Sequence, residues 1–316
     1  MSAVIGIPQA LAFYYCHTMW RTFFSELGCQ VITSGMTDRS IIQNGAAFVP
    51  NEACLPLKCY AGHVMKLCEQ HGTPGIDLIF IPRLVCMQTK PAVKLCCPKF
   101  IGLPDMIRGL ISDVPMLSLD IDLRLRSQEV AFLDLAGRLG CSSHLARCAY
   151  DAAENAPREH SDDAVPENAH STEQIRIALL GHRYLLDDAY LCLNIKKRLC
   201  AAGCQVVDHA PDHSPLTNIS QTRVQPTSWL FEDEILFAAF RYLHADSIDG
   251  IIYLLSFGCG AGSITSEIIE HELRDSSHVP ILRIIIDEHT AEAGFQTRLE
   301  SFIDMIRIKK KQSSIE

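Results

Sequence analysis

The sequence predicts an α/β protein with two Rossmann-like domains, each built on a mainly parallel four-stranded sheet. Three observations predict this fold class. Short apolar runs alternate with segments of helical periodicity, a pattern typical of parallel strands joined by helices. The second half of the chain repeats the pattern of the first, and a segment without periodicity separates the two halves.

The first predicted domain, residues 1–150, contains four strands and five helices. The expected strands are 3–8, 29–34, 77–83 and 114–122. The expected helices are 9–27, 38–48, 56–71, a short helix from about Pro104, and 127–150. Between the third strand and Pro104 we expect a long loop.

An internal repeat predicts the second domain, residues 174–316. An ungapped shift of 175 residues lays Gly28-Cys-Gln-Val31 on Gly203-Cys-Gln-Val206. After the third strand the shift becomes 165 and pairs Val114-Pro115 with Val279-Pro280, which places a ten-residue contraction just past Cys97. We interpret this as a duplicated four-strand unit. Residues 151–173 are rich in acidic residues, Ala, Asn and Pro, and we expect an exposed, flexible linker there.

Composition narrows the function. The 316 residues carry a net charge of −9, which argues against nucleic-acid binding because phosphate contacts need basic residues. No apolar run is long enough to cross a bilayer, and the N-terminus has no basic region of the kind that opens a signal peptide, so we expect a cytoplasmic protein without a membrane partner. Fourteen cysteines are many for such a protein, which favours metal or redox chemistry or buried thiols.

Three cysteines stand in a distinctive context. Cys54 and Cys97 are followed closely by proline, and Cys259 is flanked by Gly258 and Gly260. Proline fixes a ligating loop, and the glycines would let the backbone approach a bulky cofactor and offer it N–H groups. In the repeat, Cys97 and Cys259 both follow a third strand, where ligands of α/β sheets bind. The residues alone leave open a metal site in the cleft between the domains or unrelated buried thiols.

Seven motifs, standing in one order, resemble the 2-hydroxyacyl-CoA dehydratase and double-cubane-cluster superfamily, in its stand-alone branch related to acyl-CoA dehydratase activases. The motifs are Ile5-Gly-Ile-Pro8, Glu52-Ala-Cys-Leu-Pro-Leu-Lys58, Gly62-His-Val64, Ile81-Pro-Arg83, Cys97-Pro-Lys-Phe-Ile-Gly-Leu-Pro-Asp105, Ser256-Phe-Gly-Cys-Gly260 and Asp287-Glu-His-Thr-Ala-Glu-Ala-Gly294. Only residues 151–172 fall outside this resemblance.

The resemblance implies one 4Fe–4S cluster, held by Cys54, Cys97 and Cys259. It also implies an ATP-hydrolysing iron–sulfur activase as partner, which delivers a low-potential electron, and a pairing of this chain with itself or with a homologue. Relatives with a double-cubane 8Fe–9S cluster use six cysteines, whereas this chain shows three in motifs. The cysteines that remain candidates for further ligands are Cys16, Cys59, Cys86 and Cys96.

Polar residues on the same predicted loops are candidate catalytic groups: Glu52, Lys99, Glu288 and His289. They could deliver protons, hold a substrate or tune the cluster, and they could equally be helix caps or surface ion pairs. The resemblance implies reductive or radical chemistry on a small substrate, with or without a CoA group. The alternatives are an electron relay or assembly component without a substrate, and a zinc-binding or metal-free binding protein.

Overall fold

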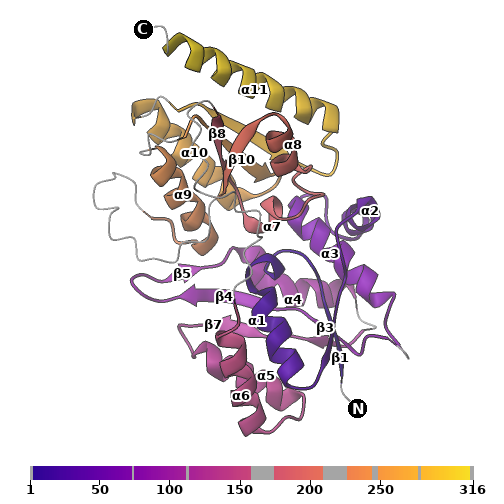
Figure 1. Ribbon diagram of the computed structural model, residues 1–316. Coiled ribbons are helices and arrows are strands. Elements are labelled where there is room, and N and C mark those ends of the chain that lie inside the picture. The colour runs from indigo at the N-terminus through magenta and orange to yellow at the C-terminus, as the bar shows by residue number, and fades with distance from the viewer. Residues whose placement is uncertain are drawn as a thin grey trace. The chain divides into compact units, whose positions relative to one another are not determined.

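The computed structural model of the chain describes residues 3–72, 75–111, 114–157, 174–208, 226–243, 248–276 and 279–313. The chain forms two compact units (Figure 1). Unit 1 comprises Met1–His160 with Ser228–Leu230, and unit 2 comprises Ser161–Thr227 with Phe231–Glu316.

Unit 1 is built on a parallel four-stranded sheet. Its strands are β1 (Val4–Ile7), β2 (Gln30–Thr33), β3 (Leu78–Phe80) and β6 (Met116–Leu117), in the order β2-β1-β3-β6. The strands are short apolar runs, and Ile5, Ile7 and Ile79 are fully buried. The predicted parallel sheet is confirmed.

Helices α1 (Phe13–Glu26), α5 (Gln128–Arg138) and α6 (Ser143–Glu154) pack together, and α2 (Arg39–Phe48) packs on α3 (Leu55–Cys68). The prediction of one helix over 127–150 is wrong, because Gly140 has a φ of 77° and α5 ends there. α6 continues to Glu154, past the predicted start of the linker. Residues 158–173, most of that linker, lie outside the described residues.

An aromatic core joins α1, α5 and the sheet of unit 1. Trp20 and Phe24 meet Phe80 edge-on, with ring centroids 5.0 and 5.1 Å apart. Phe23 meets Phe132 in the same way at 4.7 Å. Each such ring buries a large apolar area, so this contact fixes α1 against β3.

A second, small sheet interrupts unit 1 after β3. It contains β4 (Arg83–Gln88), β5 (Lys94–Leu95) and β7 (Asp120–Asp122), in the order β5-β4-β7. Helix α4 (Pro98–Leu110) follows β5. The predicted long loop is therefore wrong, and the predicted strand 114–122 is two short strands in different sheets.

Unit 2 repeats the main sheet of unit 1. Its strands β8 (Ile175–Leu180), β9 (Cys204–Asp208), β10 (Gly250–Ser256) and β11 (Ile281–Ile286) are parallel and lie in the order β9-β8-β10-β11. Numbered within each unit, both sheets have the order 2-1-3-4. The helices described in unit 2 are α7 (Arg183–Leu186), α8 (Ile195–Ala201), α9 (Leu230–Leu243), α10 (Gly260–Ser276) and α11 (Glu292–Ser313). Among the described residues, no helix combines the length and the apolar character that a membrane crossing requires.

One local contact recurs in both units and corrects the alignment of the repeat. The Val4 N–H donates to the Asp77 carboxylate at 2.7 Å, and the Arg176 N–H donates to the Asp249 carboxylate at 2.8 Å. Val4 therefore corresponds to Arg176, so the predicted shift of 175 is three residues too large for the first and third strands. The extra residues of unit 1 consequently lie before Cys97, in the β4–β5 hairpin, and not after it.

Candidate functional site

The three motif cysteines occupy the same structural position, the residue that caps the N-terminus of a helix. Cys54 precedes α3 and Cys97 precedes α4, with nearly identical backbone angles of φ −65°, ψ 151° and φ −67°, ψ 156°. Cys259 precedes α10, and its carbonyl accepts the Ser263 N–H at 3.0 Å. The N–H groups of a first helical turn have no partner within the helix and carry a partial positive charge. Each cysteine sulfur is thus placed at a position that favours an anion.

Proline explains why two of these helices begin where they do. Pro56 and Pro98 lie in the first turns of α3 and α4, where a missing N–H costs no hydrogen bond. The prediction that α4 starts near Pro104 is wrong because Pro98 already starts the helix and Pro104 lies inside it. Cys97 is therefore a helix cap and not part of an extended loop.

Cys54, Cys97 and Lys99 lie within electrostatic reach of one another in unit 1. Burial is the largest cause of the raised pKa of the Cys54 thiol. The neighbouring Cys97 raises this pKa further, whereas the Leu57 amide and the Lys99 ammonium lower it. A buried thiol beside a second thiol is costly to ionise without a nearby cation, and a bound metal would supply that charge.

Cys96 and Cys97 differ in exposure. Cys96 is 1% exposed and its N–H donates to the Val85 carbonyl at 2.9 Å, so it belongs to the core beside β4. Cys97 is half-buried. Cys97 is thus the more accessible thiol of the two.

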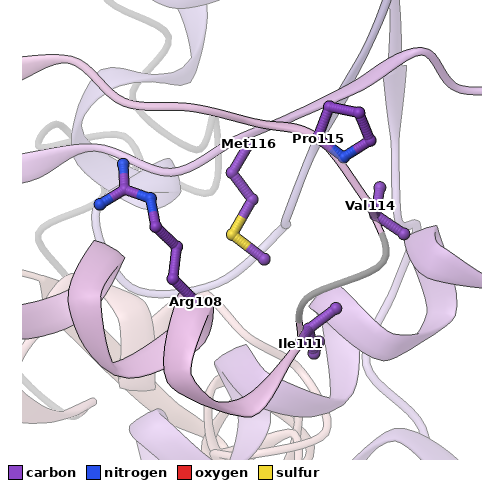
Figure 2. A pocket seen from close by; sticks show the side chains of 5 residues that line it. All are labelled: Arg108, Ile111, Val114, Pro115 and Met116. Carbon is purple, nitrogen blue, oxygen red and sulfur yellow. The ribbon is translucent and has the colours of Figure 1, made fainter.

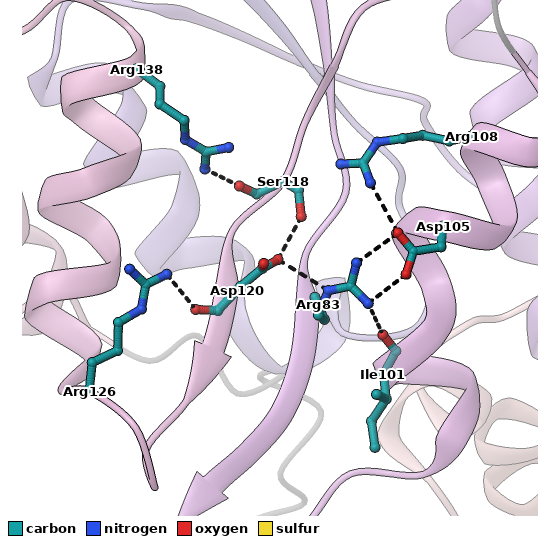
Figure 3. A network of polar contacts seen from close by, with 8 residues as sticks. All are labelled: Arg83, Ile101, Asp105, Arg108, Ser118, Asp120, Arg126 and Arg138. Carbon is teal, nitrogen blue, oxygen red and sulfur yellow. Dashed lines mark hydrogen bonds and ion pairs between the residues drawn. The ribbon is translucent and has the colours of Figure 1, made fainter.

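A polar network fastens α4 to the small sheet and so positions Cys97 (Figure 3). Arg83, the first residue of β4, donates to the Ile101 carbonyl and to Asp105, each at 2.8 Å. Its Nε also lies 3.4 Å from Asp120 Oδ1 on β7. The bond from Arg83 is the main cause that lowers the pKa of Asp105 and raises that of Arg83.

Close packing of α2 on α3 positions Cys54. A Cβ on Gly45 of α2 would lie 1.8 Å from the Lys58 carbonyl oxygen, and a Cβ on Gly62 of α3 would lie 1.9 Å from the Ile41 carbonyl oxygen. Only glycine fits at both positions, so the helices touch through their backbones.

Behind Cys54, a buried polar group surrounds His63. The His63 Nδ1 lies 2.8 Å from Ser34 Oγ, and its Nε2 lies 2.9 Å from Thr37 Oγ1. Thr37 Oγ1 also lies 3.6 Å from Cys59 Sγ. Burial, helped by the charge of Lys66, lowers the pKa of His63 from 6.5 to about 4, so the ring is neutral near pH 7. Cys59 is completely buried on α3.

Of the two glycines that flank Cys259, only Gly258 has a backbone conformation that favours glycine. Gly258 has a φ of 77°, a left-handed conformation that favours glycine. Gly260 has no such requirement, because a Cβ there would meet nothing within 4 Å among the described atoms. The Gly262 N–H lies 3.4 Å from Cys259 Sγ and directs a donor at the sulfur.

The predicted catalytic residues are dispersed between the units. Glu52, in the turn before α3, and Lys99, in the first turn of α4, are exposed in unit 1. Glu288 and His289 follow β11 in unit 2, with side chains 17% and 85% exposed and 4.0 Å apart. Lys99 lies near a motif cysteine, as its effect on Cys54 indicates.

Two residues beside Cys259 were missed by sequence reasoning. His182 Nε2 lies 2.9 Å from Glu232 Oε1, both side chains are buried, and both are near Cys259 Sγ in unit 2. The position of His182 two residues after β8, at the ligand-binding edge of the sheet, is a signal that could have identified it. Glu232 gave no signal, because an acidic residue in a first helical turn is ordinary.

One hollow of unit 1 is separate from these cysteines. It lies where α4 ends and is lined by Arg108, Ile111, Val114, Pro115 and Met116 (Figure 2). Arg108 already donates to Asp105 at 3.2 Å. Cys97 lies at the opposite end of α4, so this hollow does not belong to the candidate site.

Comparison with known families bears on the same part of the chain. Residues 4–210 match the family described as the CoA enzyme activase uncharacterised domain (DUF2229). The chain belongs to this family. The match includes all of the main sheet of unit 1, Cys54, Cys97 and the β8–β9 part of unit 2. The activase-associated family relates the chain to CoA enzyme activase systems, as the motifs indicated. No curated protein matches the sequence.

Proposed function

We propose that the chain is an iron–sulfur protein that accepts low-potential electrons from an ATP-dependent activase, for reductive or radical chemistry on a small, CoA-linked substrate. The observation that carries this proposal is the shared placement of Cys54, Cys97 and Cys259 as helix N-caps. The family of the chain supports the activase as the partner. The proposed assembly also contains a second copy of this chain or a homologue.

The chemistry of the three positions fits a cluster. Thiolates are the usual protein ligands of iron–sulfur clusters, and three of them leave one iron open to an exogenous ligand. None of the fourteen cysteines forms a disulfide, so all three motif sulfurs can serve as ligands. The N-terminal N–H groups of three helices, and the Gly262 N–H in particular, stabilise negative charge on sulfur. When bound, the cluster supplies one-electron transfer and an open iron for a substrate oxygen.

The ligand set favours one 4Fe–4S cluster per chain. The other cysteines near the motifs are packed inside unit 1: Cys59, Cys86 and Cys96 are at most 1% exposed. Cys86 Sγ donates to the Gln88 carbonyl at 3.1 Å. Cys16 lies on α1. A double-cubane cluster would need such thiols to leave their core positions.

Polar residues of the chain would handle the substrate and its protons. Lys99, which already lowers the pKa of Cys54, would attract an anionic substrate group and offset the charge of the thiolates. Glu52, Glu288 and His289 are the candidates for proton transfer, since carboxylates and imidazoles are common general acids and bases.

Electron acceptance is tested by mixing the anaerobic, iron-loaded chain with a CoA enzyme activase, ATP and a reductant. We expect bleaching of the cluster absorbance that requires both activase and ATP. The Cys97→Ala variant should show no such signal, whereas Cys148→Ala, which changes an exposed thiol on α6, should behave as the unmodified chain. Bleaching without activase, or none with it, contradicts the proposal. Consumption of an added acyl-CoA distinguishes an enzyme from an electron relay.

A further inference from the structure

Unit 2 contains a group of three potential metal ligands, of which His182 and Glu232 are buried and Cys259 is half-buried. The ligand atoms of His182, Glu232 and Cys259 all lie within 4.8 Å of one another. His182 Nε2 and Glu232 Oε1 are 2.9 Å apart, and their side chains are 3% and 4% exposed. The three residues come from different elements. His182 precedes α7, Glu232 lies on α9, and Cys259 precedes α10. Their convergence therefore depends on the folded unit.

Two polar atoms of this group have no hydrogen-bond partner among the described residues. They are Nδ1 of His182 and Oε2 of Glu232, and both are buried. A buried polar atom without a partner costs free energy that a fold normally avoids. The imidazole is also held in place, because it stacks on Tyr184 with ring centroids 4.7 Å apart. The His182–Glu232 pair is thus fixed in orientation, and its hydrogen-bonding capacity is incompletely used.

A glycine keeps the space beside the group open. A Cβ on Gly262 would lie 3.1 Å from Cys259 Sγ and 3.6 Å from His182 Cε1. The thiol and the imidazole edge therefore face the same small space on α10. The Cβ of any larger residue at 262 would enter this space. It would also lie only 2.6 Å from Leu255, which is too close for an ordinary contact.

We propose that His182, Glu232 and Cys259 bind one divalent transition-metal ion of the Zn²⁺ class. One nitrogen, one oxygen and one sulfur ligand suit an ion of borderline softness and exclude Mg²⁺ and Ca²⁺ as preferred occupants. A carboxylate, a thiolate and a neutral imidazole together balance the charge of a divalent ion in a buried site. Three protein ligands leave a fourth position open.

The distances require only small movements. In a tetrahedral zinc site, bonds of about 2.0 to 2.3 Å place the ligand atoms roughly 3.3 to 3.6 Å apart. The His182–Glu232 separation of 2.9 Å would widen by a few tenths of an ångström as the ion replaces the hydrogen bond. Cys259 Sγ lies within 4.8 Å of both other ligand atoms, so it would approach by at most roughly 1.5 Å. The site is therefore close to its metal-bound geometry.

This metal site goes beyond the proposed cluster and competes with it for one ligand. Cys259 cannot serve both, so the ion and the cluster are alternative occupants. The two depend on different remaining residues: His182 and Glu232 for the ion, Cys54 and Cys97 for the cluster. Failure of one proposal is therefore distinguishable from failure of the other.

The test is a titration of the metal-free, reduced full-length chain with Co²⁺, followed by displacement with Zn²⁺. We expect one equivalent of Co²⁺ with a sulfur-to-cobalt charge-transfer band, removed by one equivalent of Zn²⁺. Glu232→Gln, nearly the same shape, and His182→Ala should each weaken binding by at least about 100-fold, the upper limit for loss of a residue that only supports a ligand. Cys148→Ala, which changes an exposed thiol on α6, is the matched control and should bind Co²⁺ as the unmodified chain does.

Two outcomes would overturn the proposal. One is Co²⁺ binding that survives both Glu232→Gln and His182→Ala. The other is loss of binding in Cys97→Ala, which would assign the ion to the cysteines of unit 1. Circular dichroism of each variant verifies its fold, and Glu232→Gln provides the decisive comparison if His182→Ala does not fold.

Discussion

At Cys54, burial and the N–H groups at the start of the helix shift the pKa of the thiol in opposite directions. Burial raises the pKa of the thiol, while the Leu57 amide and Lys99 lower it. The balance keeps the thiol protonated until a cation arrives, so uptake of metal should release a proton. The surroundings of Cys54 thus determine how strongly protons compete with a metal for its sulfur.

His63 makes unit 1 sensitive to acid. Its pKa is lowered to about 4 in the folded chain, against 6.5 when unfolded, so the unfolded state binds the proton first as the pH falls. Stability from this group is complete above pH 6.5 and is lost as the pH falls through 4, by roughly 3 kcal/mol in total. Urea unfolding at pH 7 and pH 4 should show this loss. His63→Gln should be less stable at pH 7 but flatter with pH, and a slope equal to that of the parent chain would contradict the assignment. His144→Gln, at an exposed histidine, is the control.

Some site residues could be predicted from the sequence, and others could not. The family motif favoured Cys97 over Cys96 as the ligand, and Cys96 is only 1% exposed. The sequence did not identify His182 and Glu232, because they are distant in sequence and meet only through the fold of unit 2. Neither residue type signals a ligand by itself.

At the scale of elements, backbone contact between α2 and α3 determines where Cys54 lies. Gly45→Ala would place a Cβ 1.8 Å from the Lys58 carbonyl oxygen and must push the helices apart. We expect a loss of stability of about 3 kcal/mol in urea unfolding, the upper end of the usual cost of overpacking, together with reduced iron content.

Gly137→Ala is the matched control on α5. A Cβ at that position would meet nothing within 4 Å among the described atoms. Alanine is the better helix former, so this variant should gain about 0.5 to 1 kcal/mol. Equal effects of the two substitutions would show that α2 and α3 do not touch as described.

Element boundaries were predictable where a local signal acts alone. Asp38 was expected to begin a helix, and its carboxylate accepts the Ile41 N–H at 2.9 Å as the cap of α2. The predicted start of α4 was wrong because the segment contains two prolines that could begin a helix. Pro98 begins it, and Pro104 is tolerated inside it. The β4–β5 hairpin was missed because β5 has only two residues and pairs beyond the local sequence, with Trp229.

At the scale of the whole molecule, the duplicated unit explains why Cys97 and Cys259 correspond. Both cap the helix that follows the third strand, α4 in one unit and α10 in the other. The alternation of strands and helices predicted the two parallel sheets, because period and length are local properties. The exact offset of the repeat needed hydrogen-bond partners such as Asp77 and Asp249. Cys54 has no counterpart in unit 2, which gives the proposed ligand set its two-to-one division.

The central claim is that Cys54, Cys97 and Cys259 together hold one iron–sulfur cluster. The most direct measurement is the iron and acid-labile sulfide content of the anaerobically prepared chain and of its cysteine variants. We predict about four irons and four sulfides per chain, lost in Cys54→Ala, Cys97→Ala and Cys259→Ala and retained in Cys148→Ala. A colourless chain without sulfide, or equal iron in Cys97→Ala and the parent chain, would contradict the claim.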